Sequence, residues 1–380
     1  MRRVFAVLGA GLVLGGSFFL GYRLSTTSRA TAPVAMPSVV DEVRSAIADR
    51  YYRPVPSSVL RLSSVDEIIS ALKDPYTAYL APPDYRLVRQ ETASVYTGIG
   101  VSVLPSAGGL LVVATPPGPA AQAGIRVGDT IVRIGRSSAR NMSMQKALSR
   151  ILGPRGTSVR LEVARGMRTL HVHVRREAIR APVVDARLLA YAGRRWGDLR
   201  LAGFRAGAAV VLGRELRRLD EQGAQGFVLD LRGNPGGLLE QAVAVSSLFL
   251  DRGVVVSLVG RHEPREIYRA VGGVATRKPV VVLVDRYTAS SAEIVAAALR
   301  DHRRAVLVGE RTFGKALVQS IDPLDNGAAL ELTIARYYTP SGRDISNVGV
   351  APQIHAVDDS RTPKDDALAT ALRVLARPQS

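Results

Sequence analysis

Apolar residues in the C-terminal half of this chain fall into short runs separated by stretches with helical spacing. The runs have the length and composition of buried strands, and they cover residues 226–231, 254–259, 280–284, 305–309 and 330–338. Between them, residues 206–222 place Leu212, Leu216 and Leu219 on one face of a predicted helix. Further helices are predicted at 238–249, 292–300 and 365–375. Strands that alternate with helices indicate a layered α/β core.

Residues 97–176 have a different pattern, of short strand-like runs and glycine turns. Strands are predicted at 110–114, 127–134, 158–164 and 169–175, with short helices at 119–124 and 143–152. The order, with Pro-Ala-Ala-x-Ala-Gly-x-x-x-Gly-Asp at 119–129, resembles that of bacterial PDZ domains. Such domains bind a peptide along a strand edge and hold its terminal carboxylate in backbone N–H groups. Here we expect that loop at Tyr96, Gly98, Ile99, Gly100 and Val101.

The N-terminal part combines an apolar segment with a helical region. Residues 4–21 are uncharged and follow Arg2 and Arg3, which favours an uncleaved membrane anchor within residues 1–24. The cell membrane is then the expected location, with a single pass and the body outside the cytoplasm. A cleaved signal, leaving a secreted or periplasmic protein, is the alternative. Residues 25–38 read as a linker, and 39–95 as helical, with Ser64 and Glu67 spaced as a capping box.

Composition removes several functional classes. The chain has 51 Lys and Arg against 33 Asp and Glu, but the basic residues are scattered and aromatics make up 5%, so nucleic-acid binding is not expected. No cysteine is present, which excludes disulfides, thiolate metal sites and cysteine catalysis. Arg supplies nearly all the positive charge. A lysine in a glycine-rich, apolar loop therefore stands out, because lysine can lose its proton near neutral pH and arginine cannot.

Ser290 lies between the predicted strand 280–284 and the helix that follows it. Ser290-x-x-Glu293 is a capping-box pattern, and serine is a preferred N-cap, so a structural role explains it well. A helix N-terminus also offers free N–H groups that can stabilise an oxyanion. The residues alone therefore leave Ser290 as either a helix cap or a nucleophile, with Ser291 beside it.

Lys315 is the best candidate for a base. It follows a strand and a glycine, with Phe313, Ala316 and Leu317 around it, and burial there would lower its pKa. If the following residues are extended, Gln319 lies on the same face and can orient the amine. Residues 309–315 also fit G-x-x-x-x-G-K, but Ala316 stands where a P-loop needs Ser or Thr.

A glycine turn supplies a candidate oxyanion hole. Asn234-Pro235-Gly236-Gly237 follows one predicted strand and precedes a helix, which is also typical of a plain turn. In the functional interpretation, the N–H groups of Gly236 and Ser291 bind the oxygen of the reacting carbonyl.

Together these stretches resemble the carboxy-terminal processing peptidases (tail-specific proteases). The matching segments are LKDPYTAYL, YTGIGVSV, the PDZ-like segment, VLDLRGNPGGLL, VDRYTASSAEIVAAALRD, AVLVGERTFGKALVQ and YYTPSGRDI. The resemblance implies a crotonase-like (ClpP-like) α/β core at 178–376 with an inserted PDZ domain at 96–177. It also implies a Ser–Lys dyad of Ser290 and Lys315 assisted by Gln319, without metal or cofactor. Ser291-Ala292 stands where the family usually has Ala-Ser, which keeps Ser291 as a fallback nucleophile.

The expected function is therefore a serine endopeptidase that cleaves exported proteins and recognises their C-termini through the PDZ domain. The alternative is a PDZ scaffold on an inactive protease core. The sequence leaves the substrate and a homo-oligomeric state open.

Overall fold

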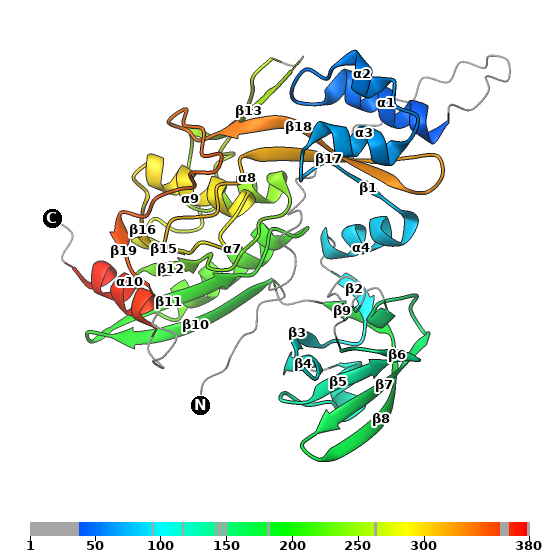
Figure 1. The fold of residues 1–380 in the computed structure, drawn as a ribbon. Coiled ribbons are helices and arrows are strands. Elements are labelled where there is room, and N and C mark those ends of the chain that lie inside the picture. Colours follow the sequence, from blue (N-terminus) through cyan, green and yellow to red (C-terminus); the bar gives the residue numbers. More distant parts are fainter. Residues whose placement is uncertain are drawn as a thin grey trace. The chain divides into compact units, whose positions relative to one another are not determined.

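The computed structural model describes residues 38–92, 95–115, 118–140, 142, 147, 150–180, 183–261, 264–357 and 365–377. They divide into two compact units (Figure 1). The smaller contains the described residues from Arg86 to Pro182, and the larger combines those up to Tyr85 with those from Val183 onward. The apolar segment 4–21, residues 25–37 of the predicted linker 25–38 and most of the predicted helix 143–152 lie outside the described residues. Within the described ranges, no helix has the length and apolar character needed to cross a membrane.

The larger unit is built on a six-stranded sheet. Its order is β10 (Val184–Tyr191), β11 (Arg194–Leu201), β12 (Phe227–Asp230), β15 (Val280–Val284), β16 (Ala305–Gly309) and β19 (Ile354–His355). β10 pairs antiparallel with β11, and all the other pairs are parallel. The strands predicted at 280–284 and 305–309 are confirmed as β15 and β16.

Helices cover both faces of this sheet. On one face, Leu229 and Val282 pack in a core with α7 (Ala208–Glu221), α8 (Leu239–Ser247) and α9 (Ser291–Asp301). On the other, Val228 and Val281 pack against α10 (Asp366–Ala376), red in Figure 1. Because side chains alternate along a strand, a run that is apolar at every position can serve two cores at once. This is why the strands read as continuous apolar runs.

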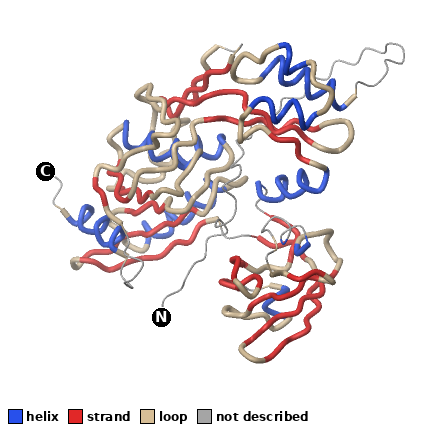
Figure 2. Tube along the Cα trace, in the orientation of Figure 1, coloured by secondary structure: helices blue, strands red, loops and turns tan. Residues whose placement is uncertain are grey.

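A second sheet of the larger unit supports the candidate site. It has the order β1 (Ala78–Leu80), β18 (Ala329–Tyr338), β13 (Val254–Gly260) and β14 (Glu266–Arg269), and β17 (Leu317–Pro323) also pairs with β18. Leu330 and Leu332 pack with α1 (Val39–Arg50) and α3 (Val65–Leu72), the helices seen beside this sheet in Figure 2. The short α2 (Ser57–Leu60) lies between them in sequence. The capping box of Ser64 and Glu67 at the start of α3 is confirmed.

The smaller unit is β-rich. Its main sheet has the order β3 (Ser102–Ser106), β4 (Gly109–Ala114), β5 (Thr130–Ile134), β7 (Ser158–Arg165) and β8 (Arg168–Arg175), with β6 (Ser137–Ser138) on β5. β2 (Val95–Gly98) pairs with β9 (Glu177–Arg180), and α5 spans Pro119–Gln122. Ile99, Ile131 and Leu161 contribute to a separate core. The division from the larger unit falls within α4 (Pro82–Thr92).

Candidate active site

Three consecutive parallel strands place the predicted site residues at one edge of the central sheet. β12, β15 and β16 are neighbours, so their carboxyl ends lie together. Gly236 follows β12, Ser290 follows β15 and Lys315 follows β16. Crevices at this edge are the usual ligand sites of open α/β sheets. The sheet topology therefore brings together residues that are up to 79 positions apart in sequence, as the difference between 315 and 236 shows.

Ser290 has an unusual backbone conformation at the start of α9. Its φ is 55° and its ψ is −120°, a combination that costs a non-glycine residue about 1–3 kcal/mol. The side chain is fully buried. It takes the capping-box position toward the backbone of Glu293, but without hydrogen-bond geometry, and among the described residues Oγ has no hydrogen-bond partner. The hydroxyl is thus held in place without being used as a helix cap.

The carboxylate of Glu293 joins the nucleophile candidate to the base candidate. Its Oε2 accepts from the backbone N–H groups of Ser290 and Lys315, both at 2.9 Å. Its Oε1 accepts from the N–H of Gly314 at 2.7 Å and from the Thr312 hydroxyl. Burial raises the pKa of Glu293 to about 7, although these hydrogen bonds favour the charged form. One side chain therefore fixes the start of α9 against the loop that carries Lys315.

Lys315 has the environment of a base rather than of a surface cation. Its side chain is only 4% exposed. Burial lowers its pKa to about 8, even though the charges of Glu331, Asp74 and Glu293 act in the opposite direction. Nζ lies 4.8 Å from the centre of the Tyr76 ring, in a cation–π contact. A substantial fraction of this amine is therefore neutral near pH 8.

Gln319 lies in β17 with its side chain fully buried. Nε2 donates to Thr333 Oγ1 of β18 at 3.3 Å. Its Oε1 is buried without a partner in the described part of the chain. The expectation that the residues after Lys315 are extended is confirmed by β17. A register shift between Val318 and Gln319 interrupts the regular pairing with β18.

The glycine turn lies directly against Ser290. A Cβ on Gly236 would be 2.8 Å from the Ser290 Cβ and 2.9 Å from the Ser291 nitrogen, so only glycine fits there. The N–H of Gly236 donates to Asn234 Oδ1 at 2.9 Å. The hydroxyl of Ser291 donates to the Gly237 carbonyl at 2.8 Å. The two candidate oxyanion donors are thus adjacent, but that of Gly236 is engaged by a side chain in this structure.

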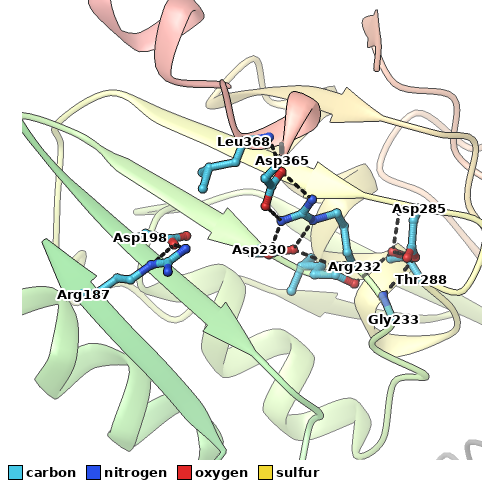
Figure 3. A network of polar contacts seen from close by, with 10 residues as sticks. Arg187, Asp198, Asp230, Arg232, Gly233, Asp285, Thr288, Asp365 and Leu368 are labelled. Carbon is cyan, nitrogen blue, oxygen red and sulfur yellow. Dashed lines mark hydrogen bonds and ion pairs between the residues drawn. The ribbon is translucent and has the colours of Figure 1, made fainter. Parts of the chain in front are cut away.

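A network of ion pairs and hydrogen bonds, drawn in Figure 3, also holds the turn after β12 in place. Arg232 binds Asp230 at 2.7 Å and Asp365, the N-cap of α10, at 2.9 Å. The N–H of Gly233 donates to Asp285 Oδ1 at 2.9 Å, and the Thr288 hydroxyl lies 3.0 Å from the same oxygen. The turn after β12 is therefore held both to α10 and to the loop that leads to Ser290.

The residues expected to bind a peptide C-terminus lie in the smaller unit. Tyr96 and Gly98 belong to β2, and Ile99, Gly100 and Val101 follow it. The Ile99 side chain is fully buried in the core of this unit, and its carbonyl accepts from Ala120 of α5 at 2.9 Å. Gly100 has a φ of 75°, which favours glycine.

Sequence reasoning gave no catalytic role to Glu293, Tyr76 or Tyr337. Glu293 appeared only as part of a capping box, and the pattern Ser-x-x-Glu cannot show that its carboxylate also binds the Lys315 loop. Tyr337 is fully buried, and its hydroxyl donates to the Ser290 carbonyl at 3.3 Å. In the described ranges, no group of three or more His, Asp or Glu side chains is arranged to hold a metal ion.

Comparison with known proteins agrees with this architecture. The pattern of peptidase family S41 matches residues 195–356, and that of the PDZ domain matches residues 112–165. The carboxyl-terminal-processing protease of Picosynechococcus is 39% identical over 79% of this chain and 74% of its own length. The carboxy-terminal processing protease CtpA of Bacillus subtilis is 32% identical over 95% of this chain and 78% of its own length.

Solved structures give the same result. The photosystem II D1 C-terminal processing protease aligns with a TM-score of 0.58 at 30% identity, covering 89% of this chain and 96% of its own. A putative S41 protease from Bacteroides fragilis, at 17% identity and a TM-score of 0.59, shares the fold. The protein therefore belongs to peptidase family S41, as a PDZ-containing serine peptidase of the carboxyl-terminal-processing group.

Proposed function

We propose that this peptidase cleaves with a Ser–Lys dyad, in which Ser290 is the nucleophile, Lys315 the general base and Gln319 the residue that orients Lys315. The observation that carries the proposal is that the Glu293 carboxylate accepts hydrogen bonds from the backbone N–H groups of both Ser290 and Lys315. This contact brings together, in one buried cluster, a lysine of lowered pKa and a hydroxyl that has no hydrogen-bond partner among the described residues. Such a pair is the arrangement needed to activate a serine without histidine.

In the proposed reaction, the neutral amine of Lys315 takes the Ser290 proton while Oγ attacks the peptide carbonyl carbon. The resulting ammonium then protonates the leaving amine, the C–N bond breaks, and an acyl-serine remains. Water then attacks this ester while Lys315 again accepts a proton. The Lys315 ammonium gives that proton to Ser290 Oγ as the acyl C–O bond breaks and the acid leaves. In the structure the Ser290 hydroxyl has no partner within the described ranges, so we regard this arrangement as a resting one.

The oxyanion is proposed to bind the N–H of Ser291, which belongs to the first turn of α9 and so needs no helical partner. Gly236 would add a second donor once Asn234 Oδ1 releases its N–H. One such donor contributes roughly 3 kcal/mol to transition-state binding in other serine proteases. The hydroxyl of Ser291 is bonded to Gly237, which favours Ser290 over Ser291 as the attacking residue.

We further propose that the PDZ unit recognises substrate C-termini through residues 96–101, and that the substrates are exported proteins. The basic N-terminus followed by an uncharged apolar segment supports export, with a membrane anchor as our preferred form. The proposed domain limits remain 96–177 for the PDZ domain and 178–376 for a crotonase-like core.

Digestion of unfolded casein tests the function. We expect the wild type to cleave casein, Ser290→Ala to be inactive and Ser291→Ala to remain active. Cleavage by Ser290→Ala would refute the proposed nucleophile. A wild type that binds peptides with free C-termini but does not cleave them would indicate the inactive scaffold instead.

A further inference from the structure

A buried chain of hydrogen bonds leads from Gln319 to the turn that precedes β1. The hydroxyl of Thr333, which accepts from Gln319 Nε2, lies 3.3 Å from Thr77 Oγ1. Thr77 Oγ1 lies 2.8 Å from Asp74 Oδ2. Each of these four side chains is buried. The chain therefore connects the α3–β1 turn to the candidate active site through β18.

Asp74 sets the direction of each hydrogen bond in this series from Gln319 to Thr77. An ionised carboxylate only accepts, so the single hydroxyl proton of Thr77 goes to Asp74. The Thr77 oxygen can then only accept from Thr333, from its hydroxyl and also from its backbone N–H at 3.2 Å. Since the Thr333 proton is used in this way, its oxygen must accept from the Gln319 amide nitrogen. None of these hydrogen bonds can reverse its direction unless Asp74 loses the hydrogen bond from the Thr77 hydroxyl.

This direction decides which end of the Gln319 amide is available to Lys315. With Nε2 committed to Thr333, the buried Oε1 is the free end, and it has no partner in the described part of the chain. A neutral lysine amine has two N–H donors and one lone pair. If Oε1 accepts an N–H, the lone pair stays available for the Ser290 proton. A reversed amide would instead offer an N–H to that lone pair and compete with the serine.

We propose that Asp74 is a positioning residue of the protease site, which acts through Thr77 and Thr333 to keep the Gln319 oxygen available to Lys315. This inference rests on the proposed function, because it takes Gln319 as the partner of the catalytic lysine.

A second set of contacts supports this role for Asp74. Its Oδ1 accepts from the backbone N–H of Tyr76 at 3.0 Å, and its Oδ2 lies 3.2 Å from the Tyr51 hydroxyl. The ring of Tyr76 is the one that contacts the Lys315 ammonium. The same carboxylate thus orders both the chain to Gln319 and the turn that places an aromatic ring against the base.

Thr77→Val tests the chain, because valine keeps the shape of threonine and lacks the hydroxyl. We expect kcat to fall about tenfold or more, which corresponds to the loss of one well-formed hydrogen bond at the transition state, with KM changed less than about twofold. Thr77→Ser restores the hydroxyl and should recover most of kcat. Thr276→Val is the matched control, since Thr276 is also buried but its hydroxyl accepts from Lys278 N–H elsewhere. All rates are taken on the alkaline plateau, where Lys315 is neutral in every variant.

A double-mutant cycle tests whether Thr77 acts through Gln319. The single-turnover rate constant is measured with enzyme in excess, in the wild type and in a Gln319→Ala background. In the Gln319→Ala background, Thr77→Val should cause no further loss of this rate constant. A merely structural effect would lower the rate constant by the same factor in both backgrounds and would overturn the proposal. So would a Thr77→Val variant that keeps kcat within about twofold of the wild type.

The Ser290→Ala variant separates this inference from the function on which it rests. If Ser290→Ala still cleaves, the proposed function fails and this inference fails with it. If Ser290→Ala is inactive while Thr77→Val behaves like the wild type, the dyad stands and the positioning role of Asp74 alone is refuted.

Discussion

Lys315 combines two opposing influences on its proton. Burial favours the neutral amine, whereas three carboxylates favour the ammonium, with Glu331 the largest of the charge effects. The pKa of about 8 that results is near the pH at which a general base is most effective. The composition gave a first indication, because only five of the 51 basic residues are lysines, as the printed sequence shows.

The pH dependence of cleavage follows from this balance. We expect kcat/KM to rise with pH and to level off above about 8, because the protonated amine cannot accept the serine proton. Glu331→Gln removes a charge that stabilises the ammonium, so the rise should move to lower pH. Glu221→Gln, at an exposed position at the end of α7, is the control and should leave the profile in place. A profile that moves to higher pH in Glu331→Gln would contradict this account of Lys315.

Lys315→Arg is the sharper substitution at the same site. Arginine keeps the positive charge but cannot lose it near neutral pH. We therefore expect no cleavage of casein at any pH up to about 9. Recovery of activity at high pH in this variant would show that another group is the base.

At the scale of elements, two helices begin with the same pattern and use it differently. α3 starts with Ser64-x-x-Glu67 and α9 with Ser290-x-x-Glu293. At α3 the serine hydroxyl accepts from the Glu67 N–H at 3.3 Å, as in an ordinary capping box. At α9 the serine hydroxyl is unpartnered within the described ranges, and the glutamate also binds the Lys315 loop.

Matched substitutions at the two glutamates test this difference. Glu293→Gln leaves several buried donors competing for one amide oxygen, so we expect a loss of about 2 kcal/mol or more in the free energy of unfolding and a fall in kcat. Glu67→Gln, at an exposed cap, should have a smaller effect on stability and none on kcat. Urea denaturation above pH 7, where the Glu293 carboxyl is charged, gives the comparison. Equal effects of the two variants would contradict the role of Glu293 as the link between α9 and the loop.

Local sequence pattern was sufficient to predict several helices and strands, but not the contacts at the candidate site. The apolar runs predicted β15 and β16, and the leucine spacing predicted α7, because burial imposes a period that can be read directly. Two features could not be read in this way. One is the positive φ of Ser290, and the other is the hydrogen bond from the Gly236 N–H to the Asn234 side chain.

At the scale of the whole molecule, the site combines segments that the sequence separates widely. β1 pairs with β18 through Tyr79 and Leu330, which brings the Asp74 turn beside Thr333. No local pattern predicts this pairing, because it depends on non-local strand contacts. The family resemblance included the segment around Asp74 without giving it a role. The residues of the proposed dyad could therefore be named from sequence as a prediction, whereas the contacts around them could not.

The PDZ unit gives a prediction for substrate choice. If it holds a substrate C-terminus, amidation of that terminus removes the charge that backbone N–H groups bind. We expect the amidated form of a peptide substrate to show a higher KM than the free acid, with kcat little changed. The two forms share one scissile sequence, so each controls for the other. Equal KM values would argue against C-terminal recognition.

Direct identification of the acylated residue tests the central claim. An acid quench during turnover of an activated peptide ester should trap the acyl-enzyme, and trypsin should then release residues 287–300, which contain both Ser290 and Ser291 between Arg286 and Arg300. Fragment-ion mass spectrometry distinguishes the two serines. We predict the acyl group on Ser290, and none in the Lys315→Ala variant. An acyl group on Ser291, or on a residue outside this peptide, would contradict the account.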